Sequence, residues 1–205
     1  MNILIPIVAV AVGFVMLTKQ NASADEAPKD ANTLLALVLS PSMVNLDQLV
    51  DFYNRFAASA ANATTPQANL RLNMYALVTA LKIAMLRKGA QPDSAELVRL
   101  AYAPSSGMGG IQQLPDAPAD VQNAAYAALA SNDPSTIAAY LAKFATAANT
   151  ATGTLKGRLM TYALALKAKQ LMTSSGINFP DNRAYYAIAN SARTTSLPAN
   201  SIMNG

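Results

Sequence analysis

The sequence of this 205-residue chain repeats itself, and this internal repeat restricts its fold more than any other feature. The stretch from Leu70 to Tyr102 returns in altered form from Arg158 to Ala192. The tripeptide Tyr-Ala-Leu that starts at Tyr75 starts again at Tyr162, 87 residues later. A repeat of this kind indicates supersecondary units that bury little apolar surface alone and share a core when they pack together.

Composition places the repeated units in the all-α class. Hydrophobic residues make up 52% of the chain and charged residues 13%, which is too apolar for a disordered chain. Alanine, the strongest helix former, supplies much of the apolar excess. No segment alternates with a period of two. We therefore expect repeat 1 at residues 33–103, a linker at 104–119, repeat 2 at 120–196 and a tail at 197–205 that is loose or bound by a partner.

Helix signals divide repeat 1 into a short apolar helix over 33–39 and three longer helices. Asn45 is a candidate N-cap for a helix that ends near residue 61, and Gln48 follows three residues later as in a capping box. The next helix is expected over 68–88, where Gly89 ends it. Asp93 and Glu96 form a second capping pair that starts a helix ending near residue 103.

Repeat 2 follows the same plan. A short helix is expected over 120–130. Asp133 before Pro134 is a strong start signal for a helix to about residue 148, because Asp favours the N-cap and Pro the first helical position. Two further helices are expected over 154–175, ended by Gly176, and over 181–192.

The N-terminus predicts a membrane anchor. Residues 1–18 carry no charged side chain, and as a helix they would reach about 27 Å, which nearly spans a bilayer core of about 30 Å. We assign residues 1–19 as a transmembrane anchor and 20–32 as a polar tether. Ala22-Ser23-Ala24 also fits a signal-peptidase site, so cleavage after Ala24 is an alternative. A buried apolar helix is a third.

A basic and aromatic stripe on the longest expected helix is the strongest candidate binding site. Residues 71, 75 and 82 fall on one helix face, and the second copy repeats the pattern. Such a stripe could grip phosphate or an acidic partner. The alternative is that the tyrosines and the aliphatic stems cover the edge of the core while the charged groups reach water. The candidate residues are Arg71, Tyr75, Lys82, Arg158, Tyr162 and Lys169.

Charge is uneven along the chain. After residue 140 there are seven basic residues and a single acidic one, Asp181. A basic C-terminal third could meet nucleic acid, anionic lipid or an acidic protein, although a solvated basic face is the simpler interpretation. The bases are Lys143, Lys156, Arg158, Lys167, Lys169, Arg183 and Arg193.

Catalytic chemistry has little support. The chain has no Cys and no His, so the usual transition-metal ligands and nucleophile–base pairs are missing, and we expect no cofactor and no metal. Two acidic pairs, Asp47 with Asp51 and Asp116 with Asp120, are interpreted as solvated or capping groups. We expect a protein that is not an enzyme.

The start of the second unit, Ala130-Ser-Asn-Asp-Pro134 followed by an Ala/Leu helix, resembles helical-hairpin segments of phage virion and bacterial envelope proteins. The resemblance covers about a third of the chain and implies a packing module with no catalytic residues. Repeat 1 departs from it at Pro41–Asn45.

Two functional hypotheses follow. The first is a membrane-anchored structural protein, most concretely a minor phage virion protein that links membrane and shell or assists genome delivery. It would contact lipid through residues 1–19, other subunits through its helices and nucleic acid through its basic third. The second is a secreted or periplasmic binding module that uses a groove between the repeats.

Overall fold

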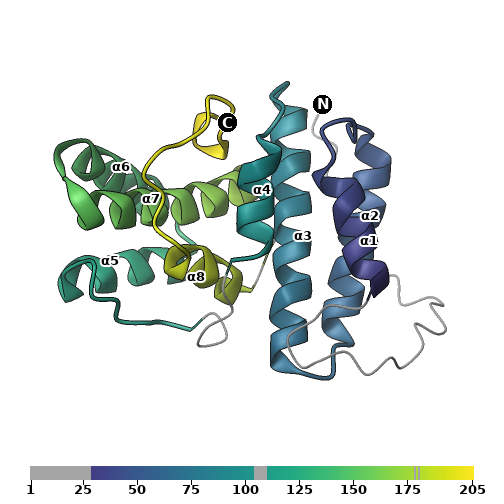
Figure 1. The fold of residues 1–205 in the computed structure, drawn as a ribbon, viewed down its shortest axis with the longest axis horizontal. Coiled ribbons are helices and arrows are strands. Elements are labelled where there is room, and N and C mark those ends of the chain that lie inside the picture. The colour runs from purple at the N-terminus through teal and green to yellow at the C-terminus, as the bar shows by residue number, and fades with distance from the viewer. Residues whose placement is uncertain (1–28, 104–109, 178, 180) are drawn as a thin grey trace.

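The computed structural model describes residues 29–103, 110–177, 179 and 181–205. All regular structure in these residues is helical, which confirms the all-α prediction (Figure 1). Each repeat contributes four α-helices, in the same order. Repeat 1 contains α1 (Lys29–Leu39), α2 (Leu46–Ala61), α3 (Pro66–Arg87) and α4 (Ser94–Ala101), and repeat 2 contains α5 (Ala119–Ala130), α6 (Pro134–Thr150), α7 (Gly153–Ser174) and α8 (Asn182–Asn190).

The helices start where the capping signals predict. The side chain of Asn45 accepts from the backbone N–H of Gln48 at 3.1 Å, and that of Asp93 accepts from the N–H of Glu96 at 2.7 Å. Asp133 accepts from the backbone N–H groups of the second and third residues after it, at 3.2 and 3.0 Å. These bonds satisfy donors that the first helical turn leaves without partners.

The two longest helices end at glycines, also as predicted. Gly89 after α3 and Gly176 after α7 have φ angles of 74° and 67°, a region that only glycine enters without strain. In both copies the next residue donates its N–H to the carbonyl five residues earlier, at 3.0 Å. This is the hydrogen bond of the Schellman motif.

Helices α3 and α7 form the centre of the protein. Each packs along a partner from its own repeat, α2 or α6, and the two also contact one another. Figure 1 shows α3 running vertically and α7 lying across the view beside it. Both are buried on nearly every side, as the unbroken run of buried residues from Met74 to Met85 illustrates. A helix that is enclosed in this way has no polar face.

The N-terminal boundary of repeat 1 differs from the prediction. Helix α1 begins at Lys29, so the expected tether, 20–32, extends four residues too far. The other helix ends agree with the predictions to within two residues. The expected anchor at 1–19 and the cleavage site at Ala24 lie outside the described residues. Within the described residues, no helix combines the length and the apolar character needed to cross a membrane.

The expectation of a loose or partner-bound tail at 197–205 is wrong. The Ser201 hydroxyl donates to Glu96 Oε1 and the Ile202 N–H donates to Glu96 Oε2, both at 2.8 Å. Ile202 is fully buried and begins a short 3-10 helix, η2 (Ile202–Asn204). The sequence assigned Glu96 to a capping box, whereas its carboxylate instead binds the C-terminal end of the chain.

The tail connects the two repeats. Just before the tail, the chain crosses α7 at Gly157, where an added Cβ would lie only 2.9 Å from the Cβ of Arg193. The N–H of Thr194 then donates to the Thr161 hydroxyl at 3.0 Å. Helix α3 of repeat 1 contacts α8 of repeat 2 directly, and between α4 and α7 the tail makes the connection. The tail is therefore part of the fold.

Glu96 should give the tail contact a recognisable pH dependence. Burial raises the pKa of the Glu96 carboxyl, and the hydrogen bonds from Ile202 and Ser201 and the charge of Arg99 oppose this rise. A carboxyl with a raised pKa binds protons more readily in the folded state than in the unfolded state. Its contribution to stability therefore falls as pH rises through the folded pKa. Relative to Glu96→Gln, the wild type should lose unfolding free energy as the pH rises above about 4, the ordinary pKa of a glutamate carboxyl, as measured by urea denaturation.

Ser201→Ala is the matched control for this experiment. It removes one hydrogen bond to the carboxylate and should lower stability by about 1 kcal/mol, while the pH dependence persists. Parallel stability curves for the wild type and Glu96→Gln would contradict the described burial of Glu96.

Candidate functional site

The six residues of the predicted stripe lie in the interior, on the two central helices. Arg71, Tyr75 and Lys82 belong to α3, and their counterparts belong to α7. Lys82 is 0% exposed, Arg158 and Lys169 are each 4% exposed, and both tyrosines are buried. Arg71 alone is half-buried.

The two arginines bind the C-terminal end of the fourth helix of their own repeat. In each case one guanidinium nitrogen, Nη1, donates to two backbone carbonyls: one in the last turn of the helix, where carbonyls lack intrahelical partners, and one just beyond the helix end. The bonds join Arg71 to Ala101 (2.8 Å) and Ala103 (3.3 Å), and Arg158 to Ala189 (2.5 Å) and Ser191 (2.9 Å).

The two lysines bind the C-terminal end of the first helix. Lys82 Nζ donates to the carbonyls of Val38 and Ser40, both at 2.7 Å. Lys169 Nζ donates to the carbonyl of Leu129 in α5 and to the side chain of Asn182. Burial lowers the pKa of both lysines, while the negative end of the helix dipole favours the cation.

The arginines differ in one respect. Nε and Nη2 of Arg158 bind the two carboxylate oxygens of Asp116, each at 3.0 Å, in a bidentate ion pair. This pair is largely buried, since the side chains are 5% and 13% exposed. In the described part of the chain, no carboxylate meets Arg71.

The two tyrosines occupy equivalent positions with different polar surroundings. The Tyr75 hydroxyl donates to the Asn32 side chain at 2.8 Å. The Tyr162 hydroxyl is buried without a hydrogen-bond partner among the described residues, and burial raises its pKa. Both rings make aromatic contacts, Tyr75 with Phe56 at 5.6 Å and Tyr162 with Phe144 at 5.8 Å between centroids.

These contacts explain why the sequence repeats the stripe. The charged groups of α3 and α7 close the ends of neighbouring helices within each repeat. Lys82, Arg158 and Lys169 do not reach water, as the simpler interpretation proposed, and do not form an open surface in this conformation, whereas Arg71 is half-buried. Binding of a partner by these residues stays a prediction, and it would require the helices to separate.

The basic C-terminal third is less exposed than its sequence indicates. Of its seven bases, Arg158 and Lys169 are buried, and Arg183 pairs with Asp181 at 2.7 Å. Arg193 lies 3.8 Å from Asp116. Of the other three bases, Lys143 is exposed, whereas Lys156 and Lys167 are half-buried.

The candidate carboxylates do not gather in one place. Asp47, Asp51 and Asp120 are exposed, and Asp116 is bound to Arg158. Asp51 pairs at most weakly with Arg55, at 3.8 Å. The described residues contain no group of three or more acidic side chains that would fit a metal ion.

A pocket of about 430 Å³ lies where repeat 1 meets repeat 2, and the sequence did not predict its residues. Asn73 Nδ2 donates to Asp181 Oδ2 at 2.9 Å, and Arg183 Nη2 donates to Asn69 Oδ1 at 2.6 Å. The signal in the sequence that could have indicated this pocket was a pair of asparagines four residues apart on a buried helix. The pocket is lined by Tyr53, Ala57, Ala60, Ala61, Asn69, Asn73, Phe179, Asp181 and Arg183.

No protein-family model, curated protein or solved structure matches this chain.

The paired tyrosines yield a matched prediction. Tyr75→Phe removes a hydroxyl that is hydrogen-bonded to Asn32, so it should lower the free energy of unfolding by about 1 kcal/mol. Tyr162→Phe removes a buried hydroxyl that has no partner in the described structure, so stability should stay the same or rise. Urea denaturation of both variants provides the comparison. An equal loss in both would show that a group is bound at the Tyr162 hydroxyl.

Proposed function

We propose that this chain is a non-enzymatic structural or interaction protein, anchored in a membrane by residues 1–19, that holds a duplicated helical body beside that membrane. The observation that supports the proposal is that the basic side chains present in both repeats bind groups inside the protein. Arg158, Lys82 and Lys169 bind backbone carbonyls inside their own repeats, as a packing module requires.

The most concrete version is a minor phage virion protein that links membrane and shell or assists genome delivery. The uncharged run over residues 1–18 supports contact with lipid. The helical body would contact other protein subunits. Lys143, Lys156 and Lys167 remain available for the phosphates of nucleic acid or lipid.

A second candidate function has its own support in the pocket between the repeats. A secreted or periplasmic form, released by cleavage after Ala24, would bind a small ligand there. Pockets at the junction of two units, with apolar walls and a few polar groups, are common binding sites. Tyr53 and Phe179 contribute aromatic rings to the wall of the pocket, and Asn73 and Arg183 contribute polar groups.

The intact mass of the native protein and its partition between membrane and soluble fractions test the proposal. We expect a full-length mass and release from membranes only by detergent. A mass that begins at Asp25, in the soluble fraction, would favour the second candidate. If the source is a phage, absence from purified particles would contradict the virion version.

A substitution within the apolar run sharpens this test. Val12→Lys places a charge in the middle of the expected span and should move the protein out of the membrane fraction. Val12→Leu is the matched control and should behave as the wild type does. Equal membrane partition of both variants would contradict an anchor at 1–19.

A further inference from the structure

A second pocket, of about 440 Å³, lies within repeat 2, beside the buried Lys169. It is formed by the loop after α5, the C-terminal end of α7 and helix α8. It is distinct from the pocket between the repeats, although Phe179 lines both. Lys169 is the only charged residue among the described residues that line it, which are Asn132, Lys169, Met172, Thr173, Gly176, Ile177, Phe179 and Tyr185.

The ammonium end of Lys169 lies at this pocket. Its Nζ is 5.5 Å from the centre of the Tyr185 ring, which also lines the pocket. An ammonium group has three N–H donors. Lys169 uses two of them, on the Leu129 carbonyl and on the Asn182 side chain. One donor is therefore left for a group inside the pocket.

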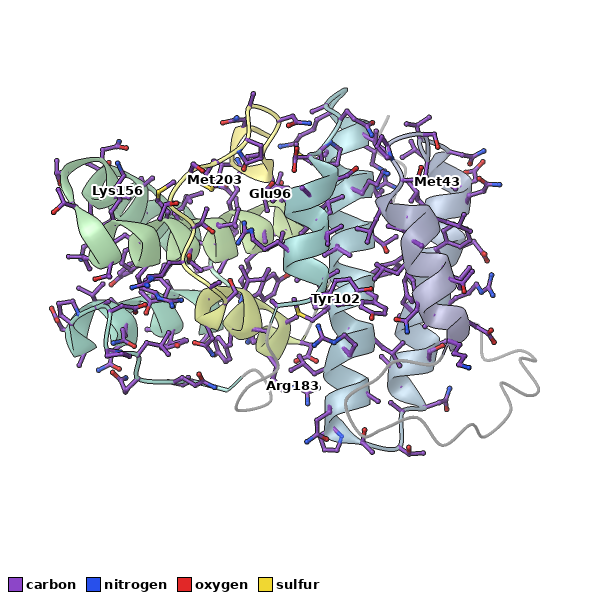
Figure 2. All side chains as sticks on the ribbon, in the orientation of Figure 1. Met43, Glu96, Tyr102, Lys156, Arg183 and Met203 are labelled. Carbon is purple, nitrogen blue, oxygen red and sulfur yellow. The ribbon has the colours of Figure 1, made fainter. Side chains whose placement is uncertain are left out.

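No carboxylate of the described residues pairs with Lys169. The acidic residues that precede α8 and α6 are bound by other groups. Asp181 is bound by Arg183 at 2.7 Å, and Asp133 is bound by the backbone N–H groups at the start of α6. Figure 2 shows Arg183 at the end of α8 that lies toward α3. Lys169 is thus a buried cation held by two neutral acceptors, and a buried cation without a counter-ion favours an anion beside it.

The equivalent place in repeat 1 is closed by a longer loop. The loop between α1 and α2 spans residues 40–45, whereas the loop between α5 and α6 spans only 131–133. The longer loop supplies a carbonyl to Lys82, and the Gln91 side chain donates to the Pro41 carbonyl of this loop at 3.0 Å. Lys82 is 0% exposed and lines neither pocket. The shorter loop of repeat 2 leaves its lysine beside an open space.

We propose that this pocket binds a small carboxylic acid whose carboxylate pairs with the ammonium group of Lys169. One cation with one free donor suits a monoanion, since a phosphate dianion favours a second positive charge. Asn132 and Thr173 add polar side chains to the wall. Met172 and the Tyr185 ring provide contact surface for the carbon skeleton of the acid. Pockets of this size commonly hold small molecules.

The size of the ligand gives it access to Lys169. A protein or nucleic acid could reach the stripe only after the helices had separated, whereas a small molecule reaches Lys169 in the described conformation. The site belongs to repeat 2 alone. It depends neither on a membrane anchor nor on the pocket between the repeats, and it therefore goes beyond both proposed functions.

A fluorine NMR titration of the full-length protein in nonionic detergent tests this proposal, with para-fluorobenzoate as the probe. The amide para-fluorobenzamide has nearly the same shape but no charge, so it isolates the contribution of the carboxylate. We expect the acid to bind at least about tenfold more tightly than the amide, because a hydrogen bond between two charged groups is stronger than one to a neutral group. Inorganic phosphate at equal concentration should not displace the acid.

Two lysine variants locate the site. Lys169→Met should weaken binding of the acid at least about tenfold, because it removes the cation from the pocket. Lys82→Met is the matched control, since it removes an amine that is just as buried but lines neither pocket. It should leave binding unchanged. Circular dichroism establishes that both variants are folded at the temperature of the titration.

A second pair of variants leaves both lysines in place. Thr173 and Ser174 are neighbouring exposed residues of α7, and of the two only Thr173 lines the pocket. Thr173→Trp places a large ring at the pocket and should weaken binding of the acid at least about tenfold, because the ring occupies part of the space. Ser174→Trp should bind the acid as the wild type does.

Equal affinity for the acid and the amide would overturn the proposal, and so would displacement of the acid by an equal concentration of phosphate. Unchanged binding by Lys169→Met, or an equal loss in Lys82→Met, would overturn it as well. If Lys169→Met does not fold, the tryptophan variants decide, because equal affinity of Thr173→Trp and Ser174→Trp would contradict a site in this pocket. Membrane partition is measured separately and is not affected by these results.

Discussion

The fold depends on basic side chains from the two central helices that bind the open C-terminal ends of their neighbours. A helix end leaves carbonyls without partners, and burying them is costly unless donors are supplied. Arg71 and Lys82 supply those donors in repeat 1, as Arg158 and Lys169 do in repeat 2. One central helix thus fixes the ends of both the first and the fourth helix of its repeat.

This arrangement explains how an alanine-rich chain with few aromatic residues specifies one packing. Alanine faces let helices approach closely but distinguish poorly between alternative alignments. A lysine whose ammonium group must reach two particular carbonyls allows only one of these alignments. The contacts between the two repeats, in contrast, are not duplicated. The tail joins α4 to α7 through Glu96, whereas α3 contacts α8 directly.

Local signals in the sequence predicted most of the fold. Asn45, Asp93, Asp133, Gly89 and Gly176 start or end helices by mechanisms that involve only nearby residues, so they were found. Contacts between distant residues were not. Glu96 binds residues more than 100 positions away, and the spacing of the stripe showed which residues share a face but not that the face is interior. Of the residues that line the pocket between the repeats, the sequence analysis noted Asp181 and Arg183, but only as charged residues of the C-terminal third and not as parts of one site.

The most direct test of this account is the stability of Lys82→Met and Lys169→Met, measured by urea denaturation beside Lys88→Met, whose side chain is exposed. Methionine keeps the apolar stem but donates no hydrogen bond. We expect each buried substitution to lower the free energy of unfolding by about 2 kcal/mol or more, because buried carbonyls lose their donor, and the exposed one to have little effect. Equal stability of all three variants would contradict the central role assigned to the buried lysines.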